Sequence, residues 1–96
     1  MNPHTLQRFL LYTADNAENS QQAVANLTAL CRKYLPGRHQ IEIVDVFKDP
    51  KRALADHIFM TPITIRLAPA PVRRIVGTLS DTEKVVAALG LDLLPA

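Results

Sequence analysis

Cysteine, glycine and aromatic residues are scarce in this chain of 96 residues. A single cysteine, Cys31, cannot close an internal disulfide, which agrees with a reducing compartment. With only three glycines there is no glycine-rich phosphate loop, and because aromatic residues make up 5% of the chain, the core must come from Leu, Val, Ile and Ala. The length suits one such core, so we expect a single domain over residues 1–96.

A strong charge of one sign and long apolar stretches are also missing. The net charge of +2 is too small for a general polyanion-binding field, so nucleic acid is not an expected partner. No apolar run approaches the roughly 20 residues that span a bilayer. The N-terminus lacks a basic region followed by an apolar stretch. These features predict a cytoplasmic protein with no membrane partner.

The first half of the chain alternates between strand and helix patterns. Residues 9–14 form an apolar run typical of a strand covered on both faces, and residues 41–46 form a second strand. Between them, apolar residues recur on one helical face as far as Tyr34, with Asn19 or Ser20 as the N-cap. A helical crossover predicts parallel strands, and we expect the second strand to lie at a sheet edge.

The second half adds a helix, two strands and a last helix. Asp49 before Pro50 predicts the start of a short helix that ends near Phe59. Strand patterns follow over residues 63–67 and 72–76, joined by a proline-containing hairpin connection. The prolines cannot donate to a strand ladder, so they belong to the connection.

The C-terminal helix has a distinct start signal. Ser80 and Glu83, three residues apart, form a capping box ahead of a helix over about residues 81–89. The resulting order, βαβαββα, is that of an α/β, thioredoxin-like domain. Thioredoxin-like proteins have a cis proline before their third strand, which predicts a cis Thr61–Pro62 bond with a structural role.

Side chains that enzymes use do not gather in a catalytic pattern. His4, His39 and His57 are scattered and have no metal-ligand spacing. In a thioredoxin-like fold the redox pair would follow the first strand, but residues 16–20 contain no sulfur, and Cys31 lies on the inward helix face. No Ser-His-Asp order or nucleophile elbow appears. We expect no enzyme activity, no metal and no cofactor.

Two segments, 42–50 and 60–77, carry Asp-Val, Asp-Pro, Thr-Pro and Pro-x-Pro-Val-Arg-Arg in this order. With these motifs, the chain resembles the circadian clock protein KaiB family over nearly its whole length. The resemblance implies a non-enzymatic regulatory protein that binds a hexameric ATPase of the KaiC type and modulates its phosphorylation or ATPase cycle. Leu10 and Gln22 replace basic residues that are typical of clock members, which suggests a divergent paralogue, in circadian or stress signalling.

The resemblance also raises an alternative fold. KaiB proteins are fold switchers, and their other state has the order βαββααβ and is tetrameric. Residues 83–89 are rich in helix formers, and about two extra residues precede Gly90 and Asp92, which the resemblance marks as the fold-switch region. Both features favour the thioredoxin-like state. Self-association as a dimer or tetramer stays open.

Basic residues cluster between positions 48 and 74. We expect Arg66, Arg73 and Arg74 to flank the proline hairpin, point outward and contact a partner together with Lys48. The edge strand around Glu42 is a site where a partner can add a strand. The alternative function is a thioredoxin-like sensory or protein-interaction module, similar to the N-terminal domain of a clock-output histidine kinase.

Overall fold

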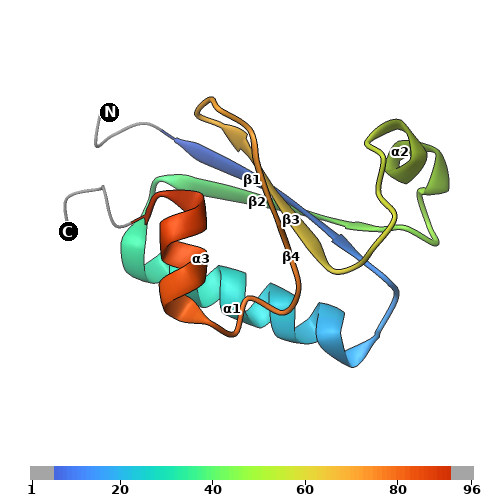
Figure 1. Ribbon diagram of the computed structural model, residues 1–96, viewed down its shortest axis with the longest axis horizontal. Helices are drawn as coiled ribbons and strands as arrows, with labels where there is room; N and C mark the ends of the chain where they lie inside the picture. The colour runs from blue at the N-terminus through green and yellow to red at the C-terminus, as the bar shows by residue number, and fades with distance from the viewer. Residues whose placement is uncertain (1–5, 92–96) are drawn as a thin grey trace.

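The computed structural model describes residues 6–91 as one four-stranded sheet covered on both faces by helices (Figure 1). Helices α1 and α3 lie on one face, and the short helix α2 lies on the other, toward one end of the sheet (Figure 1). The order is βαβαββα, as predicted, and the elements are β1 (Gln7–Thr13), α1 (Glu18–Tyr34), β2 (His39–Asp45), α2 (Pro50–Ala55), β3 (Ile63–Ala68), β4 (Arg73–Val76) and α3 (Thr82–Leu89).

The strands follow the order β2-β1-β3-β4 across the sheet. Strand β1 pairs with β2 in parallel, with Phe9 opposite Ile41, and with β3 in antiparallel. Strand β4 pairs with β3 in antiparallel, with Arg66 opposite Arg73. The parallel first pair and the edge position of β2 are therefore confirmed, and β4 forms the other edge. The C-terminal half is in the thioredoxin-like state, not the βαββααβ state.

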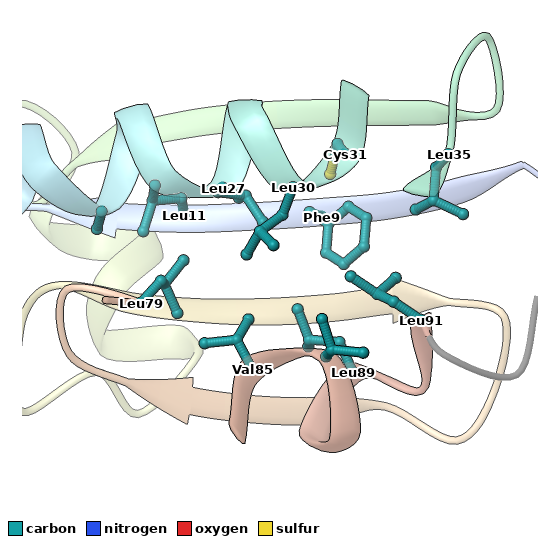
Figure 2. Packing of buried hydrophobic residues seen from close by; sticks show 12 residues of the cluster. Phe9, Leu11, Leu27, Leu30, Cys31, Leu35, Leu79, Val85, Leu89 and Leu91 are labelled. Atoms are coloured by element: carbon teal, nitrogen blue, oxygen red, sulfur yellow. The ribbon is translucent and has the colours of Figure 1, made fainter. Parts of the chain in front are cut away.

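Two apolar clusters lie on the two faces of the sheet. The larger cluster joins β1 to α1 and α3, and Figure 2 shows its leucine side chains facing one another across the layer between these elements. Cys31 is fully buried in it, as predicted, and burial raises the pKa of its thiol to about 12. The smaller cluster lies beneath α2 and contains Leu10, Tyr12, Val44, Ala53, Ile63 and Ile65.

Helix α1 begins at a different residue from the one predicted. The N-cap of α1 is Ala17, and Ser20 lies inside the helix, where its hydroxyl accepts a hydrogen bond of 3.0 Å from the Ala14 amide. Neither Asn19 nor Ser20 is the cap, so that prediction was wrong. Ser20 instead fixes the turn between β1 and α1.

The predicted capping box at the start of α3 is wrong by one residue. The N-cap is Asp81, whose carboxylate accepts a hydrogen bond of 3.3 Å from the Lys84 amide. The Ser80 hydroxyl pairs instead with the Thr78 hydroxyl at 2.6 Å. Aspartate caps a helix as well as serine does, so the neighbouring side chain takes the role and Glu83 remains in the first turn.

Helix α2 starts as predicted and ends earlier. Asp49 is its N-cap and accepts a hydrogen bond from the Arg52 amide. The helix ends at Ala55 because His57 has a positive φ of 57°, and the Ile58 amide then donates to the Ala53 carbonyl at 2.9 Å. This turn sends Ile58 back toward the smaller cluster and leaves Phe59 outside any helix.

Three X–Pro peptide bonds in the second half of the described chain are cis. The Thr61–Pro62 peptide bond is cis, as predicted, and Pro62 is buried directly before β3. The Ala68–Pro69 and Ala70–Pro71 bonds are also cis, in the connection between β3 and β4.

Candidate partner-binding surface

Arg66, on the central strand β3, is 2% exposed and points into the layer between the sheet and α3. Its guanidinium donates one hydrogen bond to the Leu89 carbonyl at 2.8 Å and another to the Pro71 carbonyl at 2.9 Å. Burial and the nearby charge of Arg73 lower its pKa. The prediction that Arg66 points outward was therefore wrong, and its side chain holds the end of α3.

Arg73 lies opposite Arg66 in the β3–β4 pair and is exposed. It donates a hydrogen bond of 3.3 Å to the Ala88 carbonyl, also in the last turn of α3. The Gly90 amide, in the left-handed region with φ 71°, donates to the Ala87 and Val86 carbonyls. Carbonyls at a helix C-terminus lack intrahelical partners and attract cations, so both arginines stabilise this helix end.

Gly90 thus acts as the C-cap of α3 in this fold. Of the two predicted fold-switch residues, it is the one whose position is defined, because Asp92 lies outside the described residues. A Cβ at position 90 would approach an Arg66 nitrogen to 3.5 Å, which is ordinary contact, but the positive φ strains any L side chain there.

Arg74 projects to the other face of the sheet. Its guanidinium donates a hydrogen bond of 2.9 Å to the Asp56 carbonyl, directly after α2. Successive residues of a strand alternate between faces, so Arg73 and Arg74 do not form one cluster. They offer two exposed positive charges on either side of the β4 edge.

Glu42, on the edge strand β2, is tied to α2. Its carboxylate accepts two hydrogen bonds from the Arg52 guanidinium, at 2.7 and 2.8 Å. These bonds lower the pKa of Glu42. Within residues 6–91 no other strand pairs with the outer edge of β2, so its backbone groups remain open to a partner strand.

Lys48 lies in the turn between β2 and α2 and is exposed. No other described residue forms an ion pair with its ammonium group. The predicted site residues therefore fall on separate parts of the molecule, with Lys48 and Glu42 around α2, Arg73 and Arg74 at β4, and Arg66 inside.

A further polar network was not predicted from the sequence. The Tyr12 hydroxyl, from the centre of the sheet, donates to the Asp56 carboxylate beside the end of α2. Burial is the main cause, and the contact with Asp56 the second, of the rise in the pKa of Tyr12 to about 12. Together with the bonds from Arg52 and Arg74, this contact ties α2 to three strands. Only the tertiary fold brings positions 12 and 56 together, so no local pattern indicated it.

Exposed aromatic side chains were also missed. Phe47 and Phe59 are 73% and 83% exposed and lie on either side of α2 in the sequence. The signal was present in composition, since the chain has only three phenylalanines, and two of them adjoin predicted helix ends.

Residues 16–20, which follow β1 at the position where thioredoxins hold their redox pair, contain no sulfur in this chain. Among residues 6–91, no three His, Cys, Asp or Glu side chains gather in a way that would hold a metal ion. In the same range, no helix is both long and apolar enough to cross a membrane.

Comparison with solved structures defines the class of this protein. The fold matches chloroplastic thioredoxin z with a TM-score of 0.74 at 15% identity, covering 92% of this chain and 80% of that one. It matches the N-terminal domain of Synechococcus elongatus SasA with a TM-score of 0.71 at 16% identity, covering 90% and 85%. The domain is thioredoxin-like, without a dithiol at the first turn.

Sequence comparison then gives the family. The KaiB domain matches residues 10–91. The chain is 44% identical to the circadian clock protein KaiB3 of Synechocystis sp., over 88% of this chain and 81% of that protein. It is 40% identical to the circadian clock oscillator protein KaiB of Synechococcus elongatus, over 98% and 90%. The chain belongs to the KaiB family.

Proposed function

We propose that this chain is a non-enzymatic regulatory protein that binds a hexameric ATPase of the KaiC type and modulates its phosphorylation or ATPase cycle. The supporting observation is family membership across the described fold, at 40% identity over 98% of the chain to a clock oscillator protein. The role belongs to circadian or stress signalling. It requires no reaction on the chain itself, only a surface that recognises the ATPase.

The exposed side chains at β4 and α2 support this role. Arg73 and Arg74 present positive charge on both sides of one sheet edge, and Lys48 adds a third cation beside α2. Rim charges of this kind mainly raise the association rate and fix the register of a complex. The open edge of β2 around Glu42 offers backbone hydrogen bonds to a partner strand.

Arg66 contributes indirectly in this proposal. Because it is buried and bonded to the Leu89 carbonyl, it positions α3 behind β4 and does not contact the ATPase. Its replacement is expected to weaken binding only through a change in fold.

Titration against the KaiC-type ATPase from the same genome tests the proposal. Arg73→Glu with Arg74→Glu should weaken binding about tenfold or more at low salt, with a smaller loss at high salt because exposed charges are screened. The matched control is Arg32→Glu, an exposed arginine on α1 that should bind like wild type. Circular dichroism checks that the variants keep their fold. Absence of binding by the wild type, or an unchanged ATPase and phosphorylation cycle when it binds, would reject the proposal.

The second candidate is a thioredoxin-like interaction module, favoured by the fold similarity to the SasA N-terminal domain. The same titration separates the two functions. A regulatory KaiB protein changes the rate of ATP hydrolysis or phosphorylation, whereas a pure interaction module binds and leaves both rates unchanged.

A further inference from the structure

The outer edge of β4 carries backbone groups that no described residue uses. Strand β4 pairs with β3 alone among the described strands, and directly after it the Gly77 amide donates to the Pro62 carbonyl at 2.9 Å. Hydrogen-bonded and non-hydrogen-bonded pairs alternate along an antiparallel ladder. The backbone of Ile75 therefore bonds to β3, whereas the N–H and C=O groups of Arg74 and Val76 point away from the sheet.

This edge lacks two features that commonly prevent a further strand from pairing. Strand β4 contains no proline, and its pairing with β3 shows no shift of register. Val76 and Val72, directly before β4, are 50% and 59% exposed and share the face of Arg74, because strand residues alternate between faces. Exposed apolar side chains on either side of Arg74 can pack against alternate side chains of an added strand.

The charges of the edge determine which strand can pair with it. Arg73 and Arg74 lie on opposite faces, and neither forms an ion pair with a described carboxylate. They donate to the backbone carbonyls of Ala88 and Asp56, which leaves their positive charges without a counter-charge. Burial, and then the nearby charge of Arg73, lower the pKa of Arg66, so a carboxylate beside Arg73 would offset this repulsion. An acidic strand complements this edge, and a basic one is repelled.

The order of the side chains specifies the added segment. Consecutive residues of a strand alternate between faces, so two adjacent acidic residues place one carboxylate beside Arg74 and the next beside Arg73. In an antiparallel pairing, the residue after this acidic pair faces Val72, and the residue two positions before the pair faces Val76. The complementary pattern is therefore apolar, any residue, acidic, acidic, apolar.

We propose that the outer edge of β4 binds an extended acidic segment of a partner protein by antiparallel strand addition, with adjacent carboxylates at Arg73 and Arg74. This inference rests on the partner-binding role of the two arginines proposed above and names the chemistry of the segment that they recognise. The opposite sheet edge, β2, carries Glu42 and Asp45, so the same segment is not attracted there. A single short strand buries little area, so the isolated segment binds with a dissociation constant on the order of 1 mM.

Titration with the end-blocked peptide Thr-Val-Thr-Glu-Glu-Val-Thr, followed by NMR, tests the proposal in the absence of any ATPase. At about 5 mM peptide, the Arg74 and Val76 amides should exchange with solvent at least about threefold more slowly, because each gains an acceptor. The Ile75 amide, already bonded to β3, should change little. No slowing at Arg74 and Val76 overturns the strand addition and leaves the proposed function to its own titration.

Two control peptides separate charge from backbone pairing. Lys-Lys in place of Glu-Glu should weaken binding at least about tenfold, because like charges then meet. N-methylation of the peptide residues opposite Arg74 and Val76 should do the same, because it removes the N–H groups that face β4. Equal binding of the acidic and lysine peptides overturns the proposal. Undiminished binding of the N-methylated peptide also overturns it, since the contact would then depend on charge alone.

Charge exchange on the protein gives a further test. Arg73→Glu with Arg74→Glu should reverse the preference, so that the lysine peptide binds more tightly than the acidic one. Arg32→Glu, on the exposed side of α1, is the matched control and should keep the preference of the wild type. An unchanged preference in the double variant overturns the proposal. So does slower exchange of the Arg74 amide when the wild type alone is concentrated, because a second copy would then occupy the edge.

Discussion

The two faces of the sheet are held in different ways. On one face, α1 and α3 pack against β1 through a large cluster of aliphatic side chains and Phe9. On the other, α2 covers a smaller cluster and is tied down by polar contacts from Tyr12, Arg52 and Arg74. Apolar burial is non-directional, whereas hydrogen bonds fix a particular geometry. Because the first face buries more apolar side chains, we expect it to contribute more of the stability, whereas the hydrogen bonds of the second face fix the position of α2.

Matched leucine-to-alanine substitutions on the two faces should give the largest difference in the free energy of unfolding. Leu27→Ala, in the larger cluster, and Leu10→Ala, in the smaller one, both remove a fully buried side chain. Such changes cost roughly 2–5 kcal/mol, and we expect Leu27→Ala near the upper end because more aliphatic neighbours surround the cavity. Urea unfolding followed by circular dichroism measures both. Leu54→Ala, 69% exposed on α2, is the control, and equal losses at positions 10 and 27 would contradict the contrast.

Tyr12→Phe should have the next largest effect, on the α2 face. Loss of the hydroxyl removes the contact to Asp56 and costs about 1.5 kcal/mol near pH 7. Because folding raises the pKa of Tyr12 from 10.0 to about 12, its stabilising contribution is complete below pH 10 and is lost as the pH rises toward 12.

Urea midpoints at pH 8 and pH 11 measure this pH dependence. The gap between wild type and Tyr12→Phe should narrow at the higher pH. The difference between the two proteins removes the separate titration of Cys31, which is common to both. A gap that widens at pH 11 would show that the hydroxyl does not stabilise the fold in its neutral form.

The start of α3 gives the smallest expected effect. Asp81→Ala removes the N-cap and should cost about 1 kcal/mol, whereas Ser80→Ala should change the free energy of unfolding by less than about 0.5 kcal/mol. Urea unfolding of both variants at pH 7 makes the comparison. A larger loss of stability in Ser80→Ala than in Asp81→Ala would show that Ser80, and not Asp81, caps the helix.

Local patterns were sufficient for much of the fold. The apolar run of β1, the helical spacing of α1 and the Asp49–Pro50 start of α2 predicted element order, parallel pairing and the burial of Cys31. These features depend on periodicity and end signals within a few residues of one another. Such local signals do not distinguish between two neighbouring side chains that can both cap a helix. The N-cap of α3 was therefore predicted at Ser80, one residue before its position at Asp81.

The candidate site was less predictable because it depends on which faces are covered. Strand alternation correctly places Arg66 on the face of the sheet opposite to that of Ile65 and Leu67. The end of α3 covers the face that carries Arg66, so its side chain is buried and does not reach solvent. Alternation alone would have separated Arg73 from Arg74. Phe59 was placed at a helix end, and no glycine or proline announced the left-handed turn at His57 that leaves it exposed.

The buried guanidinium of Arg66 has a consequence for how the native protein opens. The Arg66 side chain comes from β3 and donates hydrogen bonds to the end of α3 and to the β3–β4 connection. None of these three segments can move away from the others without breaking one of these bonds. We therefore expect them to open as one cooperative unit in native-state hydrogen exchange, with slow amides that share a single opening free energy. Helix α2 contributes no partner to the bonds of Arg66, so we expect its amides to exchange through a separate opening, which must break its own contacts to Tyr12, Glu42 and Arg74.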